Sequence, residues 1–96
     1  MKMNGENEIM FVKPWNEEAE NILRKLSTYG RARTYNVQLA RDFSKRTEIR
    51  QLCSQGFFSI SNNRRNHESW FNIPEDVFVS PRNTKRGLGF EFKKLF

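Results

Sequence analysis

Apolar side chains between residues 17 and 29 recur every three to four positions, which is the spacing of one face of an α-helix. The members of this stripe are Ala19, Ile22, Leu23, Leu26 and Tyr29. Asn16 is a favourable N-cap, glutamates crowd the first turn where the helix dipole favours negative charge, and Gly30 can end the helix. The pattern therefore predicts a helix over residues 17–29.

Two shorter apolar stripes follow and predict two further helices. Residues 31–35 are expected to be short and extended, and Asn36 can cap the helix after them, whose apolar positions are Val37, Leu39, Ala40 and Phe43. Ser44 or Thr47 can cap the third helix, and Gly56 can stop it. Its inward positions are Ile49, Leu52 and Cys53. Two short helices joined by a tight connection form a helix-turn-helix.

Beyond Gly56 the apolar period changes to two, which is typical of strands with one buried face. Phe58 and Ile60 alternate with Ser59 and Ser61, and Phe71 and Ile73 alternate with Trp70 and Asn72. The residues between these strands are polar and turn-prone, and they include the adjacent pair Arg64 and Arg65. We therefore expect a β-hairpin with a basic tip.

The two ends of the chain predict additional elements. Residues 9–12 form a short apolar run that can be a strand or a tucked arm. Residues 74–76 can begin a turn that buries Val77 and Phe78. Residues 80–86 are typical of a basic linker. A last strand carries Leu88, Phe90 and Phe92 on one face. This stripe must be covered either by the chain's own core or by a second subunit, so a homodimer through it is one expectation. The expected organisation is an arm over 1–13, a domain over 14–79 and a basic extension with a terminal strand over 80–96.

Length and composition limit the classes of protein to which this chain can belong. A chain of 96 residues with 36% apolar residues and nine Phe predicts one small domain with a Phe-rich core. The single Cys53 and single His67 exclude an internal disulfide and argue against a structural metal site, and no cofactor is expected. No apolar run approaches a membrane span, and the first residues lack the hydrophobic region of a signal peptide. We expect a cytoplasmic protein without membrane contact.

Charge is distributed unevenly along the chain. The formal net charge is +6 with a pI near 9.9, yet residues 1–20 carry a net charge of −3 and residues 21–96 carry +9. A basic body of this kind indicates a polyanionic partner, usually nucleic acid. The alternative is a basic surface that serves only solubility.

The element order and three segments resemble the winged helix-turn-helix DNA-binding family. Residues 34–43 are similar to that family's strand entering the second helix, residues 52–60 to the passage from recognition helix into wing, and residues 71–73 to the returning wing strand. The resemblance covers about residues 17–75. It implies an α+β fold, a small winged helix-turn-helix of three helices and a β-hairpin wing, here with an additional C-terminal strand. It also implies a sequence-specific double-stranded DNA-binding protein, such as a small transcriptional regulator, that performs no chemistry.

The resemblance also implies which residues contact DNA. The third helix would enter the major groove, with Arg50 and Gln51 reading base edges, because Arg can bond guanine and Gln adenine in bidentate fashion. The wing would carry contacts to the minor groove or its phosphates, and the segment beside the second helix would contact phosphates. The full set is Arg31, Arg33, Lys45, Arg46, Thr47, Arg50, Gln51, Arg64 and Arg65. With roughly six phosphate contacts, affinity would fall steeply with salt.

Two other classes of protein remain as alternatives. A small inhibitor or adaptor could bind a host protein machine. The start of the chain also resembles that of small ribosome-dependent RNase toxins, for which Arg64, Arg65 and His67 would be the candidate catalytic groups. Cys53 at an apolar helix position fits a small core residue better than a nucleophile, and Trp15 and Trp70 fit packing better than base stacking.

Overall fold

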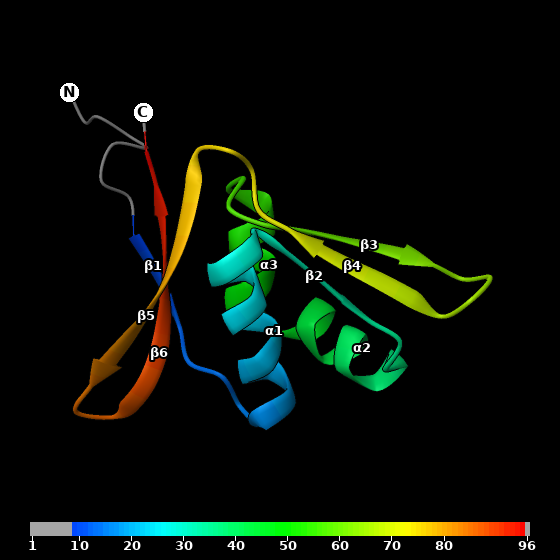
Figure 1. Ribbon diagram of the computed structural model, residues 1–96, viewed down its shortest axis with the longest axis horizontal. Coiled ribbons are helices and arrows are strands. Elements are labelled where there is room, and N and C mark those ends of the chain that lie inside the picture. The colour runs from blue at the N-terminus through cyan, green and yellow to red at the C-terminus, as the bar shows by residue number, and fades with distance from the viewer. Residues whose placement is uncertain (1–8, 96) are drawn as a thin grey trace.

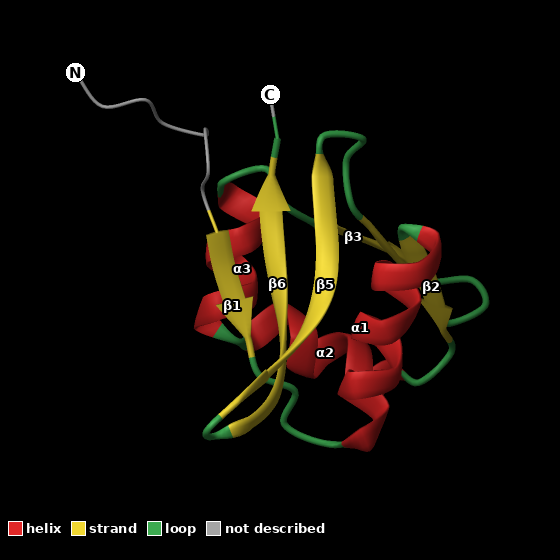
Figure 2. Cartoon of the chain, turned by 60° about the vertical axis from the view of Figure 1, so that its left-hand side comes forward, coloured by secondary structure: helices red, strands yellow, loops and turns green. Residues whose placement is uncertain are grey.

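The computed structural model describes residues 9–95 and places three helices between two three-stranded antiparallel sheets (Figure 1). The elements are β1 (Ile9–Val12), α1 (Glu17–Tyr29), β2 (Arg31–Thr34), α2 (Val37–Lys45), α3 (Thr47–Ser54), β3 (Ser59–Asn63), β4 (Glu68–Asn72), β5 (Val77–Thr84) and β6 (Gly87–Lys94). One sheet has the strand order β1-β6-β5 and the other β2-β4-β3. Figure 2 shows the β1-β6-β5 sheet in front of the helices, with β2 and β3 behind them.

The expected winged helix-turn-helix of three helices, a hairpin and one further strand is wrong as a description of the fold. The described chain is α+β, but it contains six strands in two antiparallel sheets and is more strand-rich than that expectation. The main difference is residues 80–86, which are not a linker. Most of them belong to β5, which pairs with β6 from Val77↔Lys94 to Thr84↔Gly87. The domain boundary expected after residue 79 therefore falls inside a strand.

The predicted first helix is confirmed over Glu17–Tyr29. The Asn16 side chain accepts a hydrogen bond from the Ala19 N–H at 2.8 Å, and Gly30 adopts the left-handed conformation with φ 78° at the other end. The inward stripe of Ala19, Ile22, Leu23 and Leu26 is buried. Tyr29 does not belong to it, because its position at the last turn leaves the side chain 73% exposed.

The second and third helices are confirmed, but the third starts without the expected cap. Asn36 caps α2 by accepting from the Leu39 N–H at 3.0 Å. At α3 the N-cap residue is Arg46, which makes no side-chain cap hydrogen bond, and Thr47 is already helical. Ser44 instead donates its hydroxyl to the Ala40 carbonyl within α2 at 3.0 Å.

The predicted hairpin follows Gly56 as β3 and β4, and β2 adds to it along β4. Its four-residue tip is fixed by two asparagine side chains: Asn63 accepts from the Arg65 N–H at 3.0 Å, and Asn66 accepts from the Glu68 N–H at 3.2 Å. His67 takes the left-handed position of the tip, with φ 60°. The hairpin extends along the 46 Å axis of the molecule, and the β5-β6 hairpin lies at the opposite end (Figure 1).

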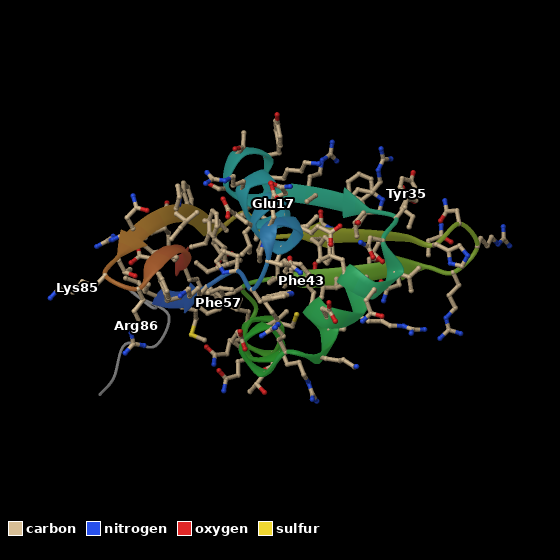
Figure 3. All side chains as sticks on the ribbon, turned by 90° about the horizontal axis from the view of Figure 1, so that it is seen from below. Glu17, Tyr35, Phe43, Phe57, Lys85 and Arg86 are labelled. Carbon is tan, nitrogen blue, oxygen red and sulfur yellow. The ribbon has the colours of Figure 1, made fainter. Side chains whose placement is uncertain are left out.

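One core joins both sheets through the helices. Phe43 of α2 lies 4.9 Å from Phe71 of β4 between ring centroids, and Phe58 lies 6.0 Å from Phe92 of β6. Figure 3 shows Phe43 and Phe57 in the interior, where Phe57 is fully buried. The β5 alternation turns Val77 and Val79 inward, so the expectation that Phe78 is also buried is wrong: it is 56% exposed.

The terminal stripe is covered by its own chain. Phe90 and Phe92 are fully buried, and Leu88 packs partly buried against the same core. The homodimer expected through Leu88, Phe90 and Phe92 is therefore not supported, because the two phenylalanines have no surface left to offer. Across residues 9–95, the helices fall short of the length and apolar character that crossing a membrane requires.

Candidate functional site

Two neighbouring clefts lie along the helix-turn-helix and the β3-β4 hairpin. The first, which we call the α2 cleft, has a volume of about 650 Å³ and separates α2 from the hairpin. It is lined by Val37, Ala40, Arg41, Ser44, Lys45, Asn62, Asn63, Arg64, His67, Glu68 and Ser69. The second, the α3 cleft, has a volume of about 810 Å³ and separates α3 from β3. Its polar lining is Ser44, Thr47, Arg50, Gln51, Ser54 and Ser59. Ser44 lines both, so the two clefts are adjacent at this residue, and we refer to them together as the groove.

Helical periodicity explains how α2 presents cations to this groove. The cleft-lining positions of α2 fall at 37, 40, 41, 44 and 45, which is one face of a helix. Leu39 and Phe43 lie on the other side and are buried. Burial of that apolar face therefore turns Arg41 and Lys45, one turn apart, towards the hairpin.

The groove has a net positive charge. Arg41, Lys45, Arg50 and Arg64 are all exposed, and within residues 9–95 none of them forms an ion pair. The one carboxylate among the lining residues of the two clefts is Glu68. It accepts hydrogen bonds from Arg33 at 3.3 Å and from the Tyr35 hydroxyl at 3.5 Å, so its charge is compensated from outside the groove.

The structure brings together five of the predicted residues and adds others. Lys45 and Arg64 line the α2 cleft, while Thr47, Arg50 and Gln51 line the α3 cleft. Arg65 lies exposed at the hairpin tip beside Arg64. The sequence analysis missed Arg41, Asn62 and Asn63. Arg41 could have been found, because it is four residues before Lys45 and therefore shares its helix face.

Arg46 is used differently from the prediction. Its guanidinium lies 4.0 Å from the centroid of the Trp15 ring and pairs with Glu48 at 4.0 Å. Trp15 in turn packs edge-on against Phe43, with 4.8 Å between ring centroids. Arg46 therefore covers the core at the junction of α2 and α3, where the chain turns.

Arg31 and Arg33 lie apart from the groove. They project from the outer face of β2 into a third cleft of about 600 Å³, which we call the β2 cleft. Both guanidiniums lie over the ring of Trp70, at 5.6 Å and 5.3 Å from its centroid. Five of the nine predicted residues thus line the groove, whereas Arg31 and Arg33 lie on a different surface.

The groove contains few groups suited to covalent chemistry. Burial raises the pKa of the Cys53 thiol, which disfavours the nucleophilic thiolate. Among the residues that the structure describes, no group of three or more His, Cys, Asp or Glu could hold a metal ion. His67 and Arg64 both line the α2 cleft, but from the turn of the hairpin rather than from a sheet.

No protein-family model matches the chain, and no curated protein or solved structure matches it. The resemblance to a DNA-binding family stays a prediction, and the argument for function rests on the residues and their geometry.

Proposed function

We propose that this protein binds double-stranded DNA through the groove formed by α2, α3 and the β3-β4 hairpin. The observation that carries the proposal is the gathering of Arg41, Lys45, Arg50 and Arg64 along the two clefts of the groove, all exposed and without ion pairs within residues 9–95. Exposed cations on one surface are the chemical complement of a phosphate backbone. In this proposal the protein acts in the cytoplasm as a small sequence-specific regulator and carries out no reaction.

Helix α3, helix α2 and the β3-β4 hairpin make different contacts with DNA in this proposal. Helix α3 is eight residues long, and an α-helix with its side chains is about 10–12 Å across, which fits a major groove about 12 Å wide. Arg50 and Gln51 are exposed on α3, and their side chains have the donors and acceptors that distinguish guanine and adenine. Arg41 and Lys45 bind phosphates beside the helix, and the tip arginines Arg64 and Arg65 reach the next phosphates or the minor groove.

Salt dependence is the measurement that tests this proposal most directly. Four phosphate contacts predict that the logarithm of the affinity falls with the logarithm of salt concentration with a slope of about −3.6. Fluorescence anisotropy with a labelled random duplex, titrated at several salt concentrations, measures this slope. A salt-independent affinity, or no binding at low salt, would contradict the proposal.

Matched arginine and lysine variants locate the contact surface. Arg50→Ala and Arg64→Ala should each weaken duplex binding by roughly ten-fold, by loss of a charge-assisted contact. Lys85 is the control, because it is an exposed cation at the far end of the molecule (Figure 3), and Lys85→Ala should leave affinity unchanged. An equal loss in all three variants would indicate a diffuse charge effect rather than this groove.

Sequence preference and the absence of chemistry need separate tests. In a selection from randomised duplexes, Gln51→Ala should relax the preference at one base position, whereas Arg41→Ala should weaken all sequences alike. Ribosome-dependent mRNA cleavage that is lost in His67→Ala would contradict the non-catalytic proposal. A stoichiometric protein complex whose formation blocks duplex binding at the groove would instead favour the inhibitor class.

A further inference from the structure

The outer face of the β2-β4-β3 sheet has a different character from the groove. Strand alternation turns Ala32 and Phe71 inward to the core and leaves the opposite side of the sheet to Arg31, Arg33 and Trp70. With Lys25, Tyr29, Ala32 and Tyr35, these three residues line the β2 cleft. The cleft therefore combines three cations with three aromatic rings.

The two arginines lie over the rings of Trp70 and Tyr35. Arg33 lies directly across from Trp70 in the strand register, and its guanidinium is 5.3 Å from the Trp70 centroid and 5.4 Å from the Tyr35 centroid. Arg31 lies over the same Trp70 ring at 5.6 Å. Stacking holds each guanidinium in a defined position, so less side-chain entropy is lost when its N–H groups bind an anion.

The charge of the cleft is not balanced by acidic residues. None of its lining residues is a carboxylate, and within the described chain Arg33 alone of its cations pairs with one, Glu68 at the hairpin. Lys25 and Arg31 form no ion pair within residues 9–95. Two of the three rings are also open to solvent, since Tyr35 is 56% exposed and Tyr29 73% exposed.

Aromatic faces beside unpaired cations complement a ligand that alternates flat rings with negative charges. Single-stranded nucleic acid has this chemistry, because its unpaired bases can stack on aromatic rings and on guanidinium planes while its phosphates bind cations. A duplex keeps its base faces stacked inside, and an acidic peptide supplies charges without rings. We therefore propose that the β2 cleft is a second site, which binds single-stranded nucleic acid with a base on Tyr35 and phosphates on Arg31 and Lys25.

This second site is independent of duplex binding by the groove. The groove and the β2 cleft share no lining residue, and neither Arg31 nor Arg33 lines the groove. Variants can therefore separate the two activities. Loss of one activity without the other shows which proposal fails.

The test uses the full chain and labelled oligo(dT) and oligo(U) of eight nucleotides. Both are measured by fluorescence anisotropy, and binding of either strand supports the site and identifies the sugar it prefers. In the Trp15→Phe protein, Trp70 is the one remaining tryptophan, so binding should also quench intrinsic fluorescence. No binding of either strand, or binding without a change in Trp70 fluorescence, would overturn the proposal.

Matched variants identify the contacts. Loss of a stacked base predicts that Tyr35→Ala weakens single-strand binding by roughly ten-fold, while Tyr35→Phe, which keeps the ring, retains it. Phe11→Ala is the control, because Phe11 is also exposed, at 44%, and lies on β1 at the edge of the other sheet. Arg31→Gln should weaken binding, whereas Arg86→Gln at the far end should not. Circular dichroism shows whether each variant keeps its fold, and a loss shared by Phe11→Ala would contradict the site.

Two competitors complete the experiment. A duplex at saturating concentration should leave the single strand bound, and Arg31→Gln should keep its duplex affinity. Oligo-glutamate of equal length should not displace the oligonucleotide. Displacement by oligo-glutamate would show that charge alone is recognised and would overturn the proposal.

Discussion

Single asparagine side chains fix the starts of two helices. The first N–H groups of a helix have no partner within it. Asn16 and Asn36 each accept a hydrogen bond from one of these groups, at 2.8 Å and 3.0 Å. Asn16→Ala should therefore lower the free energy of unfolding by about 1 kcal/mol in urea denaturation. The control is Asn21→Ala, an exposed position in the same helix, where alanine has the higher helix propensity and stability should not fall. Equal losses in both variants would contradict the role of Asn16 as a cap.

At the same scale, the sequence identifies the caps and the cations but not the contacts of each cation. Helical spacing is sufficient to place Arg50 and Gln51 on an exposed face. It cannot show that Arg46 covers Trp15, because the two are 31 positions apart and meet only after the helices pack. Arg31 and Arg33 are separated from the groove for a similar reason, since the pairing of β2 with β4 decides which face of the sheet they occupy.

At the scale of elements, the β1-β6-β5 sheet depends on a contact between Phe11 and Gly89. Gly89 is buried under the Phe11 ring, and a Cβ at position 89 would overlap that ring. Gly89→Ala should push Phe11 off the strand and lower the free energy of unfolding by roughly 1 kcal/mol. In a Phe11→Ala background, Gly89→Ala should lower the free energy of unfolding by clearly less. A double-mutant cycle followed by urea denaturation measures this difference. A full cost in that background would show that the strain lies in the backbone rather than in the ring.

The elements that the sequence predicts well are those with a clear apolar period. Helix α1 is predicted at its observed bounds, α2 at its observed start after Asn36, and the hairpin in its observed place after Gly56. Strand β5 has such a period only at Val77 and Val79, because every residue from 80 to 84 is exposed. A polar run with Pro81 is therefore interpreted as a linker, although pairing with β6 makes it a strand. The second sheet, and with it the fold, depends on pairing between segments far apart along the chain, which local patterns do not contain.

At the scale of the whole molecule, the two sheets share one core and are expected to unfold together. Phe92 of β6 is fully buried and packs edge-on against Phe58, and Phe58 stacks at 6.0 Å on Phe71 of β4. A chain of rings thus connects the C-terminal strand to the hairpin that carries the groove. Disturbing β6 should therefore weaken the nucleic-acid-binding half as well, even though no residue of β6 lines the groove.

Phe92→Leu tests this connection with a mild change, since truncation to alanine at a buried phenylalanine costs about 3–5 kcal/mol and risks unfolding the chain. We expect the free energy of unfolding to fall by an amount on the order of 1 kcal/mol. The fall should appear equally in the urea midpoint followed by tryptophan fluorescence and in hydrogen exchange of the β6 amides. The tryptophans report the helical layer and β4, so a common shift means one cooperative unit. Phe78→Leu on the exposed face of the neighbouring strand should shift neither probe. Faster exchange in β6 with an unchanged fluorescence midpoint would show that the β1-β6-β5 sheet opens on its own, and that the groove does not depend on it.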